Sequence, residues 1–175
     1  TVTSLPGACA CITALTMSGQ PTRRFAFEAF LPYDKKERTQ ILENLRNETR
    51  TIIIYEAPHH LKKTLKECRK YLGNRNMTVC KELTKRYEQK RKSTLDEMIA
   101  YYEKNEPRGE YVLIFEGKSL QELKEEKQQE WNQLTVQEHM EHYLEKGMDK
   151  KSAMKQVAKD RGVSKRDIYQ ELLKK

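Results

Sequence analysis

Thr51-Ile52-Ile53-Ile54-Tyr55 is a β-branched run without alternation, and it predicts a strand that is covered on both faces. A second apolar run, Tyr111-Val112-Leu113-Ile114-Phe115, ends near Gly117 and predicts another buried strand. Helical and strand patterns alternate from the start of the chain to this second run. The sequence therefore predicts an α/β body with a mostly covered sheet.

The other elements of this body are predicted from the spacing of apolar residues. Helices are expected at 8–17, 35–47, 61–72 and 95–102, and strands at 25–30, 77–83 and 87–93. The first helix follows a Pro6-Gly7 turn, is expected to be buried because its residues are small and apolar, and stops at Gly19. The strand at 87–93 is highly charged, which predicts a position at the edge of the sheet.

The composition changes between Lys118 and Glu130, where Lys, Glu and Gln replace almost all apolar residues. We expect 118–130 to be a charged linker or an exposed helix, between an α/β domain at 1–117 and a second domain at 131–175. Three short helices follow, with capping residues at Thr135 and Glu138, at Asp149, and at Ser164 and Asp167. A tight turn at 161–163 joins the last two, which predicts a small all-α helix-turn-helix domain.

The composition favours an anionic partner and a cytoplasmic location. The 175 residues include 34 Lys and Arg against 26 Asp and Glu, and the resulting net charge of +8 favours nucleic acid. The four cysteines lack the spacing of a zinc ribbon or a disulfide framework, so reduced thiols are expected. Neither a signal peptide nor an apolar run of membrane-spanning length is visible, so no membrane partner is expected. The start at Thr1, directly before a turn, is interpreted as a cut inside a longer protein.

Common catalytic signatures are absent, including Gly-x-Gly-x-x-Gly, the P-loop, Gly-x-Ser-x-Gly and metal-spaced His or Cys clusters. The candidates are therefore unusual segments at strand ends, where open α/β sheets bind ligands. Pro6-Gly7-Ala8-Cys9-Ala10 is either a site where a ligand approaches backbone amides or a packed turn. Glu56 and His59 either perform acid–base chemistry or cap the next helix. Lys81-Glu82-Leu83-Thr84-Lys85 is either a binding segment or a solvated turn.

The C-terminal domain is a further candidate, because its positive charges accompany the helix-turn-helix pattern. Nucleic-acid contact and an ordinary solvated helix face both account for these charges, since Asp and Glu are interspersed. The basic residues are Lys150, Lys151, Lys155, Lys159, Lys165, Arg166, Lys174 and Lys175.

The order of these segments along the chain resembles one family, the RsmI-type small-subunit rRNA (cytidine-2′-O)-methyltransferases, within the tetrapyrrole methylase-like class. The segments that carry the resemblance are Pro6-Gly7, Thr13-Ala14-Leu15, Ser18-Gly19, Phe30-Leu31-Pro32, Tyr55-Glu56, Pro58-His59, Lys81-Glu82-Leu83-Thr84-Lys85, Tyr87-Glu88 and Gly109-Glu110. The resemblance covers nearly the whole chain and is weakest at 118–130. It implies a mixed sheet flanked by helices, as the second domain of the fold, followed by the helix-turn-helix domain.

The resemblance also implies an enzyme of two α/β domains that binds S-adenosylmethionine in the cleft between them, of which this chain is the second domain plus the tail. By itself the piece is expected to be inactive, and a homodimer is expected from the fold class. The implied cofactor-binding residues are Pro6, Gly7, Cys9, Ala10, Tyr55, Glu56, Leu83 and Thr84. Cys9 stands where relatives often have Ser or Thr, and His60 stands where the family usually has Arg.

The implied reaction methylates a cytidine ribose 2′-hydroxyl of 16S rRNA in the small ribosomal subunit. Glu56, His59 or a residue of the other domain is the proton acceptor, and Lys150, Lys151, Lys155, Lys165 and Arg166 contact RNA. Two alternatives remain. A small-molecule tetrapyrrole methylase shares the core fold but does not need the basic tail, whereas a non-enzymatic DNA-binding regulator explains the tail but not the strand-end segments.

Overall fold

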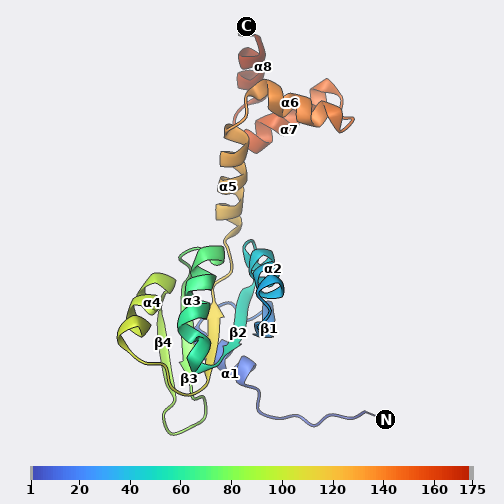
Figure 1. Cartoon of the computed structure of the whole chain (residues 1–175). Coiled ribbons are helices and arrows are strands. Elements are labelled where there is room, and N and C mark those ends of the chain that lie inside the picture. The colour runs from blue at the N-terminus through green and yellow to red at the C-terminus, as the bar shows by residue number, and fades with distance from the viewer. Residues whose placement is uncertain (1, 174–175) are drawn as a thin grey trace. The chain divides into compact units, whose positions relative to one another are not determined.

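The computed structural model describes residues 2–173, which divide into two compact units, one up to Lys118 and one from Ser119 onward. The first unit contains a five-stranded sheet (Figure 1), and its strand order is β1 (Phe25–Phe30), β2 (Thr51–Glu56), β5 (Tyr111–Phe115), β3 (Asn76–Lys81) and β4 (Gln89–Thr94). β1 runs parallel to β2, while β5 runs antiparallel to both β2 and β3. The sheet is therefore mixed, as predicted.

This topology brings three strand ends together. Because β2 and β3 both run antiparallel to β5, they run parallel to each other, and β1 shares their direction. Tyr111, at the start of β5, pairs with both Glu56 and Lys81. We call this the carboxyl end of the sheet, where β1, β2 and β3 finish and β4 and β5 begin. The candidate segments after β2 and β3 consequently meet there.

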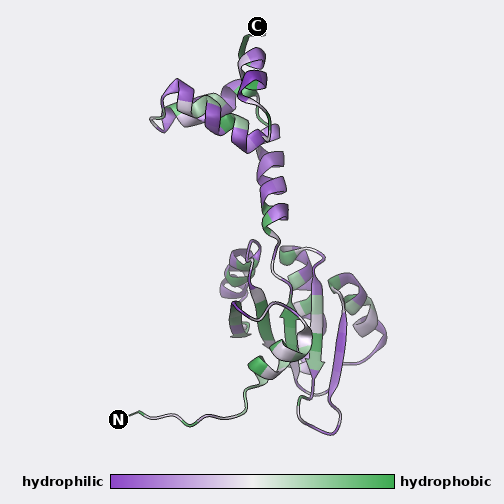
Figure 2. Cartoon of the chain, turned by 180° about the vertical axis from the view of Figure 1, so that it is seen from behind, coloured by the Kyte–Doolittle hydropathy of each residue, from purple (hydrophilic) through white to green (hydrophobic). Residues whose placement is uncertain are grey.

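The sheet is covered on both faces, as the apolar runs predict. Successive residues of a strand point to opposite faces. Ile52 and Ile54 pack against α2 (Lys35–Leu45), α3 (Pro58–Leu72) and α4 (Leu95–Lys104), whereas Ile53 packs against α1 (Ala10–Ser18). All three isoleucines have exposed fractions of 0%. The charged strand β4 lies at the edge of the sheet, also as predicted, and Figure 2 shows it as hydrophilic.

The start of the chain differs from the prediction. Residues 2–9 have no regular secondary structure and are exposed, so Pro6-Gly7 forms no turn, and α1 begins at Ala10 after an extended Cys9. Gly19 ends α1 in the left-handed conformation, as predicted. The helix is buried on one side only, because Ile12 remains 46% exposed. Strand β3 ends at Lys81 and β4 begins at Gln89, so 82–88 is a longer loop than the sequence predicts.

The second unit consists of α5 (Leu120–Asn132), α6 (Val136–Glu145), α7 (Lys150–Arg161) and α8 (Lys165–Leu173). Segment 118–130 forms most of α5, none of whose residues is buried, and Figure 2 shows this helix as largely hydrophilic. A small core lies between α6, α7 and α8, including Met140, Val157 and Ile168. The caps form as predicted at Thr135, Asp149 and Ser164. Among residues 2–173, no helix has the length and apolar character needed to cross a bilayer.

Candidate functional site

The carboxyl end of the sheet divides into two sides because Tyr55 and Glu56 are consecutive in β2 and point to opposite faces. Tyr55 faces α1. Its ring lies 5.0 Å from that of Phe27 and 5.7 Å from that of Phe30, both edge-on. Burial raises the pKa of the Tyr55 hydroxyl, and a hydrogen bond with the backbone of Cys11 opposes this shift. The Tyr55 side of the site thus reaches the first turn of α1.

Cys9 and Ala10, two predicted cofactor residues, lie at the start of α1 beside this tyrosine. Cys9 is exposed and its side chain makes no capping hydrogen bond, whereas the Tyr55 hydroxyl contacts the backbone of Cys11 in the first turn of α1. Burial raises the pKa of the neighbouring Cys11 thiol, which keeps it protonated. Pro6 and Gly7 are not brought to the sheet: both are exposed, and no other part of the described chain approaches the Cβ position of Gly7 within 4 Å.

Leu83 and Thr84 belong to loop 82–88, which follows β3. Leu83 packs against the cluster that contains Tyr55 and Cys11, so it joins the Tyr55 side of the site. The Thr84 backbone amide donates to Glu88 at 2.7 Å. The Glu82 carboxylate accepts from the Glu110 amide at 2.8 Å and from Lys85 at 3.2 Å, and the pKa of Glu82 is lowered by these two contacts, the amide first.

Three non-glycine residues adopt positive φ in the described chain, and all of them lie at this end of the sheet. They are Ala29 (φ 51°), Glu82 (φ 51°) and Thr84 (φ 62°). An L-residue in this conformation costs about 1–2 kcal/mol, and such strain gathers at functional sites. The positive-φ residues of the described chain thus gather where the candidate segments meet.

Glu56 points to the other face and is only 5% exposed. One carboxylate oxygen accepts from the Ala57 amide at 2.8 Å, and the other accepts from the Thr64 hydroxyl. Arg38 of α2 lies 3.9 Å from this second oxygen and donates to Thr64 at 2.6 Å and to Glu67 at 2.5 Å. Glu56 thereby ties the end of β2 to α2 and α3.

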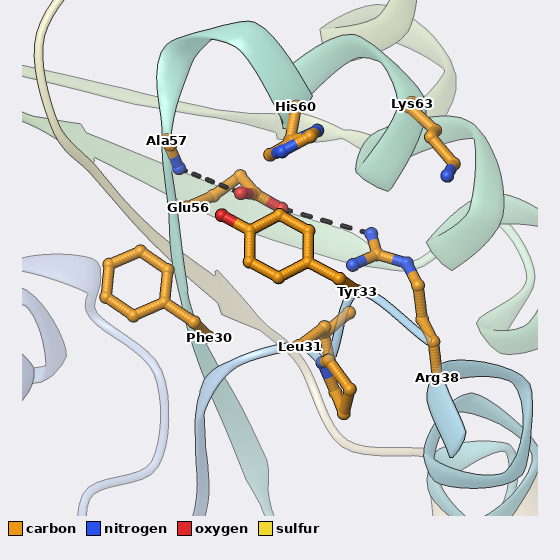
Figure 3. A pocket seen from close by; sticks show the side chains of 9 residues that line it. Phe30, Leu31, Tyr33, Arg38, Glu56, Ala57, His60 and Lys63 are labelled. Atoms are coloured by element: carbon orange, nitrogen blue, oxygen red, sulfur yellow. Dashed lines mark hydrogen bonds and ion pairs between the residues drawn. The ribbon is translucent and has the colours of Figure 1, made fainter. Parts of the chain in front are cut away.

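A pocket of about 440 Å³ opens beside Glu56, between the segment that follows β1 and the first turns of α3 (Figure 3). Its lining residues are Phe30, Leu31, Pro32, Tyr33, Arg38, Glu56, Ala57, His60 and Lys63. The ring of His60 lies 5.3 Å from that of Tyr33 and 4.1 Å from that of His59. His59 is exposed and does not line the pocket, so the second histidine, not the first, accompanies Glu56 there.

Sequence reasoning missed Tyr33, Arg38 and Lys63 as members of a site. Arg38 lies within an amphipathic helix and Lys63 within another, and nothing local distinguishes them from solvated surface charges. An arginine at a buried position of a predicted helix is the one available signal, because such a charge requires a buried partner.

The predicted RNA-contacting residues lie in the second unit, on α7 and α8. Lys150, Lys151, Lys155, Lys165 and Arg166 are all exposed, as is Lys159. Within the described chain, none of these side chains forms an ion pair. Lys174 and Lys175 lie outside the described residues. Exposed positive groups outside ion pairs are available to an anionic ligand.

The family model of the tetrapyrrole (corrin/porphyrin) methylases matches residues 1–99, which span the sheet end just described. The chain belongs to the tetrapyrrole methylase family. A solved cobalt precorrin-4 methyltransferase, a cobalamin biosynthetic enzyme, shares the fold with a TM-score of 0.50 over 64% of this chain and 50% of that one, at 18% identity. The predicted fold is therefore confirmed as a tetrapyrrole methylase fold.

Curated relatives of this member of the family carry the name ribosomal RNA small subunit methyltransferase I. The relative from Halalkalibacterium halodurans is 46% identical over 96% of this chain, and the one from Bacillus subtilis is 45% identical over 96%. The relative from Synechocystis is 38% identical over 97%. The chain spans 57% of the length of the first two relatives and 59% of the third.

Proposed function

We propose that this chain is the second catalytic domain and helical tail of an S-adenosylmethionine-dependent methyltransferase that modifies a cytidine ribose 2′-hydroxyl of 16S rRNA. The observation that carries the proposal is the identity of 45–46% to rRNA methyltransferases across both units of the chain. A DNA-binding regulator does not account for the family match over 1–99. A cytoplasmic homodimer that acts on the small ribosomal subunit belongs to the same proposal.

The residues on the Tyr55 side fit the cofactor. S-adenosylmethionine carries a carboxylate, hydroxyl groups and an adenine ring, and the site offers hydrogen-bond donors together with apolar surface. Cys9 does not cap the start of α1, which therefore suits an anion, while Leu83 and the Tyr55 ring are half-buried and suit an apolar ring. Cys9, Ala10, Tyr55, Leu83 and Thr84 would hold the cofactor, which supplies an electrophilic methyl group when bound.

The protein's own part is to orient the ribose and to accept a proton. Glu56 is buried and its carboxylate contacts Ala57, Thr64 and Arg38, so we assign it to positioning the end of β2 and not to proton transfer. His59 is exposed at the start of α3 and remains the candidate proton acceptor within this chain. A residue of the other domain is the alternative, and His59→Ala distinguishes the two by its effect on kcat.

Methyl transfer tests the proposed function. The chain, extended by its upstream half, is supplied with labelled S-adenosylmethionine and with small ribosomal subunits that lack their native methyl groups. We expect label on a ribose 2′-oxygen of the RNA. Label on a tetrapyrrole and none on RNA would overturn the proposed substrate and leave the family assignment intact.

A further inference from the structure

The pocket beside Glu56 adjoins the residues that we assign to the cofactor at Phe30, whose ring lies 5.7 Å from that of Tyr55, but most of its lining comes from elsewhere. Tyr33, His60 and Lys63 approach it from the segment after β1 and from α3, on the face that α2 and α3 cover. Cys9, Tyr55 and Leu83 lie on the α1 face. Tyr33, His60 and Lys63 are therefore separate from the residues assigned to the cofactor, and the chemistry of the pocket indicates which kind of ligand it suits.

Aromatic surface forms one wall of the pocket. Tyr33 is 85% exposed and Phe30 is 61% exposed, and the apolar ring surface that they expose would be more stable if it were covered. The ring of Tyr33 also lies edge-on to that of His60, at 5.3 Å. Exposed rings at the mouth of a pocket are typical of surfaces on which unpaired nucleobases stack.

The inner wall places a hydrogen-bond acceptor beside a donor. Glu56 is a buried carboxylate whose oxygens retain acceptor capacity, since each oxygen has two lone pairs. Arg38 uses Nε for Glu67 and Nη2 for Thr64 and Glu56, whereas Nη1 donates to no residue in the described chain. A neighbouring acceptor and donor match the Watson–Crick edge of a base, which presents both kinds of group.

Lys63 completes the arrangement at the rim. Its side chain is 65% exposed and lies 3.8 Å from Glu67, so its ammonium group remains largely solvated. Such a lysine suits the phosphate of a nucleotide whose base enters the pocket. A volume of about 440 Å³ lies within the range of small-ligand pockets and accommodates a single nucleotide.

We propose that this pocket binds one unstacked nucleobase of the RNA substrate, with the ring against Tyr33 and Phe30 and the polar edge toward Glu56 and Arg38. The assignment of the base to RNA rests on the proposed function. The adenine of the methyl donor is the other source of a base, and titration with S-adenosylmethionine distinguishes the two. Cytidine 5′-monophosphate is the natural probe, because cytidine is the proposed target.

Binding is measured by ¹⁵N–¹H NMR on the labelled 175-residue chain, with cytidine 5′-monophosphate, S-adenosylmethionine and ribose 5-phosphate added separately at up to about 10 mM. All pocket-lining residues lie between Phe30 and Lys63, so binding can be measured without methyl transfer and without the upstream half. We expect the cytidine nucleotide to shift the amide signals of Tyr33 and His60 in a saturable way. Equal shifts from ribose 5-phosphate, stronger shifts from S-adenosylmethionine, or no shift at all would each overturn the proposal.

Tyr33→Ala provides the matched variant, because a side chain that is 85% exposed is not needed for folding. It should weaken binding of cytidine 5′-monophosphate at least five-fold, which is about 1 kcal/mol at 1.4 kcal/mol per ten-fold change. Tyr169→Ala, at an exposed tyrosine of α8, is the control and should leave the dissociation constant unchanged. Equal affinities of the Tyr33 variant and the unmodified chain would contradict the stacking role. Failed methyl transfer together with intact nucleotide binding would reject the proposed function and keep this site.

Discussion

Nη2 of Arg38 and Oε2 of Glu56 lie 3.9 Å apart, although α2 and the end of β2 are separate elements and both side chains are almost fully buried. Thr64 of α3 bridges them, since it donates to the glutamate and accepts from the arginine. Three elements are thereby joined at the point where the pocket opens. A buried pair of this kind fixes geometry more than it adds stability, because both charges lose their hydration.

Arg38→Met should destabilise the first unit by about 3 kcal/mol, because it leaves Glu56 buried without its cationic partner. Unfolding in urea, followed by circular dichroism, measures the loss. Arg50→Ala is the control: Arg50 is paired with Glu48 but is half-exposed, so its removal should cost much less. Equal losses of unfolding free energy in the two variants would contradict the expectation that the buried Arg38 contributes more than the half-exposed Arg50.

Ala29→Gly should stabilise the protein by about 1 kcal/mol, because φ at Ala29 is 51° and glycine adopts this conformation without strain. Ala26→Gly is the matched change in the same strand, where the residue is buried and its φ is not positive, and it should be destabilising. Midpoints of urea unfolding compare the two. A loss of stability in both variants would mean that Ala29 is not strained.

The second unit should lose stability as the pH falls below about 6.5. Burial lowers the pKa of His139, Arg161 and His142 lower it further, and Asp160 opposes them. Nδ1 of His139 accepts from Arg161 at 3.2 Å, and a proton on this nitrogen would face that guanidinium. Because the folded-state pKa lies below the unfolded value, the stabilising contribution is present above pH 6.5 and declines as the pH falls through the folded-state pKa.

Trp131 reports this transition, because it is the only tryptophan in the sequence and stacks on His139 with 3.9 Å between ring centroids. Urea unfolding followed by its fluorescence at pH 7 and pH 5 gives the stability difference. In His139→Phe, which retains the stacked ring, the difference should be smaller than in the unmodified chain. An unchanged difference would assign the pH dependence to other groups.

Most of the fold follows from the sequence. The uniform runs at 51–55 and 111–115 predict doubly covered strands, and the capping pairs at Thr135 and Ser164 predict two helix starts, because these signals depend on neighbouring residues only. The prediction of a turn at Pro6-Gly7 was wrong. No described residue packs against Gly7 to hold the chain in a turn. Regular elements are predictable locally, whereas an isolated turn needs tertiary contacts.

The candidate site was only partly predictable. The sequence predicts candidate segments at the ends of β2 and β3, and the topology brings these ends together. The pocket was not predictable, because it combines Tyr33, Arg38 and Lys63 from three segments whose proximity depends on how α2 and α3 pack. The separation of Tyr55 from Glu56 follows from strand alternation and was available from the sequence.

Lys150→Gln, Lys151→Gln and Lys155→Gln together should weaken binding of small-subunit rRNA and reduce its salt dependence, if the exposed charges of α7 contact phosphates. Each lost contact should lower the slope of log affinity against log salt by about 0.7 to 0.9. Affinity for S-adenosylmethionine is the internal control and should not change. A large loss of cofactor affinity, or an unchanged salt slope, would contradict this division of roles between the units.

Methylation of small-subunit rRNA by this protein is tested in cells that lack its gene. Ribose methylation is mapped across their small-subunit rRNA by resistance to alkaline cleavage, and the same map is made after the intact gene is returned. We expect one cytidine to lose its 2′-O-methyl group in the deletion strain and to regain it on complementation. An unchanged methylation map would contradict the assignment to rRNA.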